Sequence, residues 1–172
     1  MAEGASGLII LDTNALITLL TADKVSSEYL NLVAYLKQCE RLTQALPMPA
    51  IAEFIAGDEN ESRSSMLLSP NSKFKNLDFD AKAALIAARI YKDYKKLPKN
   101  QKSQNPHQKV KVDIQILGIA LANNAKMIVT CDRGIKTIID ALDLQISVFD
   151  YADNNYLEQM IGAEVAQSNL VQ

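Results

Sequence analysis

Short aliphatic runs separated by helical patterns organise the chain. Residues 8–11 are uniformly aliphatic rather than alternating, as in a strand buried on both faces of a parallel sheet. The segments "KMIVTC" (126–131) and "LQISVF" (144–149) are two further candidate strands. Because strands alternate with helices, the pattern predicts an α/β fold, a three-layer α/β/α sandwich around a central parallel sheet of four to five strands.

Helical periodicity accounts for most of the intervening residues. Residues 26–46 carry apolar side chains near one face, and residues 81–96 keep a helical period after Asp80, a suitable N-cap. Further helices are predicted at residues 15–20, 49–57, 113–124 and 134–142. The polar residues 58–77 predict a loop or a weak helix, and residues 97–109 predict a loop with two prolines.

Length and composition predict one domain. The chain has 172 residues, of which 48% are hydrophobic and 22% charged, as expected for a globular protein with its own core. We expect residues 1–7 to be a disordered N-terminus, residues 8–150 to form the domain, and residues 151–172 to form a C-terminal helix and tail. Two distant cysteines, no signal-peptide pattern and no long apolar run predict a cytoplasmic protein without a membrane span.

Four acidic residues stand at or within apolar segments. Asp12 and Asp132 each follow a predicted strand directly, at the carboxyl end where sites collect in parallel sheets. Glu53 is the only charged residue of the apolar segment 42–57. Asp113 falls in line with the apolar stripe of its predicted helix, because the next apolar positions follow at helical spacing.

Each acid also has a purely structural explanation. Asp12 could cap the following helix. Asp132 suits a turn before Gly134, and Glu53 suits a solvated helix face. Asp113 suits the first turn of a helix, where the dipole favours an acid, but this does not explain why it would face inward.

A shared metal site explains all four acids together. Carboxylates buried close together raise one another's pKa, and a divalent cation removes that repulsion. The chain has a single histidine and no neighbouring pair of cysteines, so the ligands would be carboxylate oxygens. Such ligands favour Mg²⁺ or Mn²⁺ over Zn²⁺, and ions held in this way typically serve phosphoryl chemistry.

The segments around these acids resemble those of PIN-domain nucleases. The motifs "LIILDTNAL", "PAIAEFIAG", "VDIQILGIALANNAKMIVTCD" and "DRGI" occur in the order and rough spacing of that family, across residues 8–150. The resemblance is to the bacterial and archaeal type that includes the VapC-like toxins of toxin–antitoxin pairs. It implies a parallel sheet flanked by helices, a metal-dependent endoribonuclease, an antitoxin partner and a homodimer.

The resemblance also assigns roles to single residues. The metal-binding and catalytic acids of the family correspond to Asp12, Glu53, Asp113 and Asp132. The polar residues beside them, which would orient waters or carboxylates, are Thr13, Asn14 and Thr130.

A lysine-rich segment before the third acid is longer than in many compact members of the family. It holds six lysines and no acid between Tyr94 and Val112, and a solvated loop is the ordinary explanation. The net charge of the chain is −2, so RNA binding would require a local basic patch of this kind. The predicted RNA contacts are Lys99, Lys102, Lys109 and Lys111.

The favoured function is metal-dependent hydrolysis of RNA phosphodiester bonds, with Mg²⁺ or Mn²⁺ as cofactor. A non-catalytic PIN-like protein that binds RNA or a protein partner is the alternative, although the complete set of four acids favours catalysis. A phosphotransfer domain is a third class, but an aspartate phosphatase would need a second aspartate where Asn14 stands. Residues 66–68 are a candidate patch for an antitoxin, although packing inside the domain is the simpler explanation.

Overall fold

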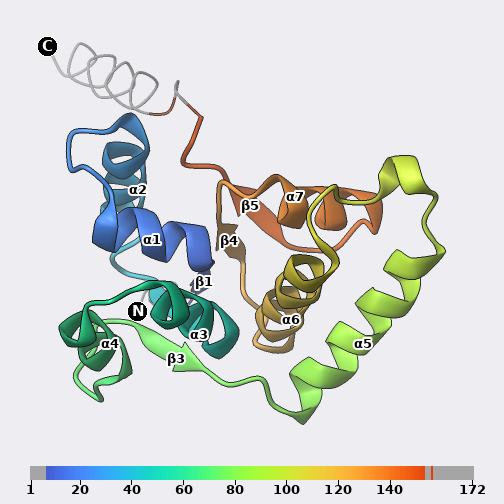
Figure 1. Cartoon of the computed structure of the whole chain (residues 1–172), viewed down its shortest axis with the longest axis horizontal. Helices are drawn as coiled ribbons and strands as arrows, with labels where there is room; N and C mark the ends of the chain where they lie inside the picture. The colour runs from blue at the N-terminus through green and yellow to red at the C-terminus, as the bar shows by residue number, and fades with distance from the viewer. Residues whose placement is uncertain (1–6, 154–155, 157–172) are drawn as a thin grey trace, which may run out of the picture.

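The computed structural model describes residues 7–153 and Tyr156 (Figure 1). This part of the chain folds around a central parallel sheet of five strands in the order β3-β2-β1-β4-β5. The strands are β1 (Leu8–Leu11), β2 (Thr43–Pro47), β3 (Lys75–Leu77), β4 (Met127–Val129) and β5 (Ser147–Phe149). The predicted parallel sheet at the centre of an α/β fold is confirmed.

Helices cover both faces of the sheet and complete three layers (Figure 1). They are α1 (Thr13–Thr21), α2 (Ser27–Gln38), α3 (Met48–Gly57), α4 (Glu61–Leu68), α5 (Ala81–Lys96), α6 (His107–Ala122) and α7 (Arg133–Ala141), with a 3₁₀ turn, η1 (Lys99–Gln101). Ile10 packs with α5, α6 and α7 in one core cluster, whereas Ile9 and Leu11 pack with α1, α2 and α4 in another. Both faces of β1 are buried, which explains its uniformly aliphatic sequence.

Strand β2 corrects the helix predicted at residues 26–46. Helix α2 ends at Gln38, and residues 43–47 pair in parallel with β1, with Ala45 opposite Ile10. A short apolar run fits a buried strand and a buried helix equally well by its pattern alone. The neighbouring strand, which the pattern does not reveal, decides between them.

Residues 58–77 are more regular than the predicted loop. Helix α4 corresponds to the weak helix foreseen there, and Asn60 caps it by accepting hydrogen bonds from the N–H groups of Ser62 and Arg63. The edge strand β3 was not predicted, because three residues are too few to carry a periodic pattern.

Helix α6 begins at His107, within the predicted loop at residues 97–109. Its first turns hold lysines and polar residues, so no apolar stripe announces them. Asp113 consequently lies beyond the first turn of the helix, and the explanation of Asp113 as a first-turn acid is wrong.

The strand order creates a switch point between β1 and β4. From β1 the sheet extends through β2 and β3 on one side and through β4 and β5 on the other. In open α/β sheets, ligands bind outside the carboxyl ends of the strands at such a point. Asp12 follows β1 and Asp132 lies shortly after β4, so the fold brings these two acids to the same edge.

The helices and the two ends of the chain bear on the predictions about a membrane span and about the termini. None of the described helices has the length and apolar character that a membrane crossing requires. The disordered N-terminus predicted at residues 1–7 and the helix and tail predicted at residues 151–172 lie almost entirely outside the described residues.

Candidate active site

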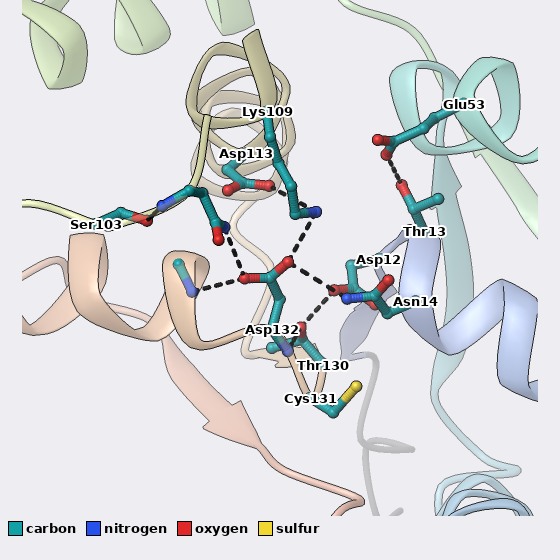
Figure 2. Close-up of polar contacts among 12 residues, drawn as sticks. Asp12, Thr13, Asn14, Glu53, Ser103, Lys109, Asp113, Thr130, Cys131 and Asp132 are labelled. Atoms are coloured by element: carbon teal, nitrogen blue, oxygen red, sulfur yellow. Dashed lines mark hydrogen bonds and ion pairs between the residues drawn. The ribbon is translucent and has the colours of Figure 1, made fainter. Parts of the chain in front are cut away.

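Two of the acids lie at the ends of neighbouring strands and cap helices. Asp12 caps α1 by accepting a hydrogen bond from the N–H of Ala15 at 2.7 Å, and Asp132 caps α7 by accepting one from the N–H of Gly134 at 2.6 Å. Thr130 joins the two, because its hydroxyl donates to Asp12 Oδ2 and accepts from the N–H of Asp132 at 2.8 Å (Figure 2). Asp12 and Asp132 therefore cap their helices and are also held side by side by Thr130.

Asp113 approaches the same place from α6. Its side chain is 2% exposed, and its Oδ2 is buried without a hydrogen-bond partner among the described residues. Its Oδ1 lies 3.8 Å from Nζ of Lys109, one helical turn earlier. The same ammonium lies 2.7 Å from Oδ2 of Asp132, so Lys109 links Asp113 to Asp132 (Figure 2).

Asp132 receives more hydrogen bonds than its neighbours. Asn105 donates to its Oδ1 at 3.2 Å, and Asn14 donates to its Oδ2 at 3.3 Å. Burial on its own would raise the pKa of Asp132, but the Lys109 ammonium and the hydrogen bonds from the N–H of Gly134 and from Asn105 bring that pKa below its ordinary value. Of the three aspartates, Asp132 is therefore the most readily charged.

The other two aspartates are held closer to neutrality. Burial raises the pKa of Asp12 to about 7, against the hydrogen bonds from Thr130 and Ala15. Burial likewise raises the pKa of Asp113 to about 7, opposed by Lys109 and reinforced by the charge of Asp132. The site thus has room for more positive charge, which would ionise both carboxyl groups.

Glu53 lies beside the three aspartates, and no hydrogen bond joins it to them. It is exposed on α3, and its Oε2 accepts a hydrogen bond from the Thr13 hydroxyl at 2.5 Å. Figure 2 shows Glu53 and Thr13 to one side of the cluster. The structure therefore joins three of the four predicted acids through Thr130 and Lys109, and it places the fourth at their margin.

The donor set fits a hard divalent cation. Within residues 7–153 and 156, no three acid, cysteine or histidine side chains stand close enough together to hold a metal ion as they are. The three aspartates nevertheless offer oxygen ligands, and Oδ2 of Asp113 lacks any partner among the described residues. The Lys109 ammonium now supplies the positive charge between Asp113 and Asp132, so a cation would compete with it for these oxygens.

A family model described as PIN domain matches residues 9–140. The chain belongs to the PIN-domain family. The matched residues include all four acids singled out from the sequence, and the resemblance to PIN domains is confirmed. Comparison with curated proteins gives no significant match.

Solved structures resemble this PIN domain over most of its length. A chain of VapBC2 from Rickettsia felis, bound to a DNA fragment from the promoter, has a TM-score of 0.58 at 18% identity, covering 83% of this chain and 98% of its own. A chain of VapBC-1 from nontypeable Haemophilus influenzae has a TM-score of 0.59 at 18% identity, covering 85% and 99%. A chain of DNA-bound VapBC from Salmonella typhimurium has a TM-score of 0.57 at 16% identity, covering 85% and 99%. At these identities the likeness establishes the fold.

The four lysines predicted to contact RNA have different surroundings in this PIN domain. Lys99 in η1 and Lys111 on α6 are exposed. Lys102 is partly buried, and its Nζ donates to the carbonyl of Lys95 at 2.9 Å. Lys109 is partly buried, and its ammonium contacts Asp113 and Asp132.

Two parts of the site were missed in the sequence. Asn105 carries no signal as a lone polar residue before a proline, yet it donates to Asp132. The ion pair of Lys109 with Asp113 could have been found, because a lysine and an acid four residues apart face each other on a helix. Gly134 permits the Asn105 contact, since a Cβ at Gly134 would lie 2.1 Å from Nδ2 of Asn105.

Proposed function

We propose that this PIN domain is a metal-dependent endoribonuclease that hydrolyses RNA phosphodiester bonds. The observation that carries the proposal is the cluster of three buried aspartates at the switch point of the sheet, with one oxygen of Asp113 left without a partner among the described residues. Asp12, Asp113 and Asp132 would hold Mg²⁺ or Mn²⁺, with Glu53 as a further ligand or an outer partner. A cation held there supplies a Lewis acid that activates water for in-line attack and offsets charge on the phosphate.

The polar neighbours of the acids keep the carboxylates in place. Thr130 fixes Asp12 relative to Asp132 through two hydrogen bonds. Asn14 orients Asp132, and Thr13 orients Glu53. Hydrogen bonds of this kind preorganise a charged site, so that little rearrangement is needed when the substrate arrives.

Lys109 balances the charge of the aspartates and then contacts RNA. In the structure its ammonium lies between Asp113 and Asp132. Once released from Asp132 it remains on the same helix as Asp113, beside the substrate phosphate. Lys99, Lys102 and Lys111 extend the positive charge available to the RNA backbone.

The same proposal makes the protein the toxin of a toxin–antitoxin pair. The similar structures include VapBC assemblies and a toxin–antitoxin complex from Klebsiella pneumoniae. A hollow of about 420 Å³ between α1, α2 and the α4–β3 segment is lined in part by Leu20, Tyr29 and Phe74. Met66 at its margin is 46% exposed, whereas Leu67 is buried in the core. An apolar segment of an antitoxin would cover this hollow, and a homodimer belongs to the same proposal.

One observation favours a non-catalytic alternative. The Lys109 ammonium already occupies the position between two of the aspartates, as in a binding protein that needs no metal ion. In that case the protein would bind RNA or a partner without cleaving either. The same experiment separates the two functions.

The test is cleavage of an end-labelled structured RNA by the chelator-treated protein, with and without added Mn²⁺ or Mg²⁺. We expect cleavage only with the metal ion. Asp12→Asn and Asp113→Asn should each lower the rate by more than about a hundredfold, which exceeds the usual effect of losing an outer partner of a metal ligand. Thermal melting of each variant checks that the fold is intact.

Asp140→Asn is the matched control, because Asp140 is an exposed aspartate of α7 that no contact joins to the cluster. It should cleave at the wild-type rate. Wild-type rates in Asp12→Asn or Asp113→Asn would refute the assignment of these residues. RNA binding by the wild-type protein without cleavage at any metal concentration would establish the non-catalytic alternative.

A further inference from the structure

A second hollow lies beside the aspartates, between the C-terminal half of α5 and the start of α6. Its volume is about 340 Å³, at the small end of the range for ligand pockets. The residues that line it include Tyr91, Tyr94, Lys95, Lys102, Asn105 and His107. It is lined by aromatic rings and by cationic side chains.

The side chains of Tyr91 and His107, which both line this hollow, contact and restrain each other. The Tyr91 hydroxyl and Nε2 of His107 are 2.9 Å apart, and the ring centroids are 6.2 Å apart at an angle of 62°. His107 is exposed and Tyr91 is half-buried. Rings restrained in this way lose little conformational freedom when a planar group stacks on them, which favours binding.

Positive charge surrounds the rings. Nζ of Lys95 lies 5.7 Å from the ring centroid of Tyr91, and Nζ of Lys102 lies 5.8 Å from that of Tyr94. None of the described residues that line the hollow is acidic. Aromatic faces beside cationic side chains are what binding of single-stranded nucleic acid requires, because the rings stack on bases while the lysines contact phosphates.

The hollow adjoins the aspartate cluster through Asn105. Asn105 lines the hollow and also donates a hydrogen bond to Asp132 at 3.2 Å. Tyr94 lies close enough to Asp113 for that charge to reinforce burial in raising the pKa of the tyrosine. A nucleotide whose base occupied the hollow would therefore have its phosphate next to the acids.

We propose that this hollow is a subsite for one unpaired base of the RNA, next to the phosphate that is cleaved. This inference rests on the proposed ribonuclease function. An RNA duplex keeps its base faces stacked inside, so only a single-stranded or looped segment can present a base to Tyr91 and His107.

The test measures binding of fluorescently labelled RNA to the full chain in an Asp12→Asn background, where cleavage is blocked. The probes are a short single-stranded oligoribonucleotide and a blunt duplex of the same sequence. We expect tighter binding of the single strand. Tyr91→Ala and His107→Ala should each weaken it about tenfold, the expected effect of losing one base–aromatic stack.

Two further variants separate stacking from structure. Tyr91→Phe keeps the ring and loses only the hydroxyl contact with His107, so it should weaken binding much less than Tyr91→Ala. Tyr29→Ala removes a tyrosine of α2 that lines other hollows and should leave binding unchanged. His107 is exposed, so His107→Ala stays informative even if Tyr91→Ala does not fold.

The outcomes distinguish this inference from the function on which it rests. If the wild-type chain cleaves RNA but His107→Ala binds the single strand as tightly as the parent, the subsite is refuted and the ribonuclease stands. The subsite is equally refuted if the duplex binds better than the single strand, or if neither binds. Binding that depends on Tyr91 and His107, without cleavage by the wild-type chain, would overturn the ribonuclease and leave an RNA-binding subsite.

Discussion

Lys109 shows how a single residue stabilises a cluster of buried acids. Its side chain is 30% exposed, and its ammonium contacts Asp113 and Asp132, whose side chains are almost fully buried. Burial lowers the pKa of this lysine, but the two aspartates together with the charge of Glu53 raise it by more, so the ammonium stays charged. Without that charge, three carboxyl groups would face one another in a poorly hydrated site.

We therefore predict that Lys109→Met lowers the free energy of unfolding of the chelator-treated protein by about 1–3 kcal/mol, somewhat less than the loss of a fully buried partner. Added Mn²⁺ should stabilise this variant more than the wild-type protein, because the ammonium no longer competes for Asp132. Urea denaturation with and without Mn²⁺ measures both effects. Lys96→Met is the control, since its ion pair with Asp93 is exposed, with side-chain exposures of 76% and 59%, and should contribute little. Equal losses in the two variants would contradict this role of Lys109.

Single residues of the site could be predicted where an acidic residue directly follows, or lies within, an apolar segment of the sequence. Asp12 and Asp132 follow strands, and Asp113 lies in an apolar stripe, so the cost of burying them was itself the signal. Glu53 gave the same signal but is exposed, because the helix that carries it turns that side toward solvent. Asn105 gave none, since its contact with Asp132 depends on a loop path that no periodic pattern encodes.

Helix α6 is the element that delivers Asp113, and its position depends on close packing against α5. A Cβ added at Gly118 would lie 2.7 Å from the carbonyl oxygen of Ala83 and 2.8 Å from Cβ of Ala87. Both contacts involve atoms on or next to the backbone, which cannot rotate away. The glycine therefore sets how near the two helices approach.

Gly118→Ala should lower the free energy of unfolding, because overpacking costs about 1–3 kcal/mol and the better helix propensity of alanine recovers about 1 kcal/mol at most. Gly57→Ala is the matched control. A Cβ at Gly57 meets nothing within 4 Å, so this change should leave stability equal or slightly higher. Denaturant titration of both variants gives the comparison. A Gly118→Ala protein as stable as the wild type would show that α5 and α6 are packed less closely than the structure indicates.

Whole elements were predictable where they are long and periodic. Helix α5 was predicted at its observed bounds, because its apolar positions keep a helical period after the capping residue Asp80. Helix α7, predicted at residues 134–142, lies within one residue of those bounds. Strand β2 was taken for helix, because Ala45 and Leu46 are apolar in either state. Strand β3 and the start of α6 were missed because polar and lysine-rich residues carry no period, and their structure comes from the neighbours on which they pack.

At the scale of the whole molecule, the parallel sheet explains why distant acids meet. Asp12 and Asp132 are 120 positions apart in the chain, yet β1 and β4 are adjacent and parallel, so their carboxyl ends coincide. The alternation of strands and helices predicted the sheet, but it did not predict that β4 rather than β2 would bring the second acid to β1. The strand order supplies that information. Three of the four acids predicted from the sequence lie together in the structure, and Glu53 lies beside them.

The proposed function requires this cluster to bind a divalent cation. The decisive measurement is calorimetric titration of Mn²⁺ into the chelator-treated wild-type protein, Asp113→Asn and the control Asp140→Asn. We predict saturable binding to the wild-type and control proteins, and its loss in Asp113→Asn while the variant remains folded. Absence of binding to the wild-type protein, or undiminished binding to folded Asp113→Asn, would contradict the assignment of the aspartates as a metal centre.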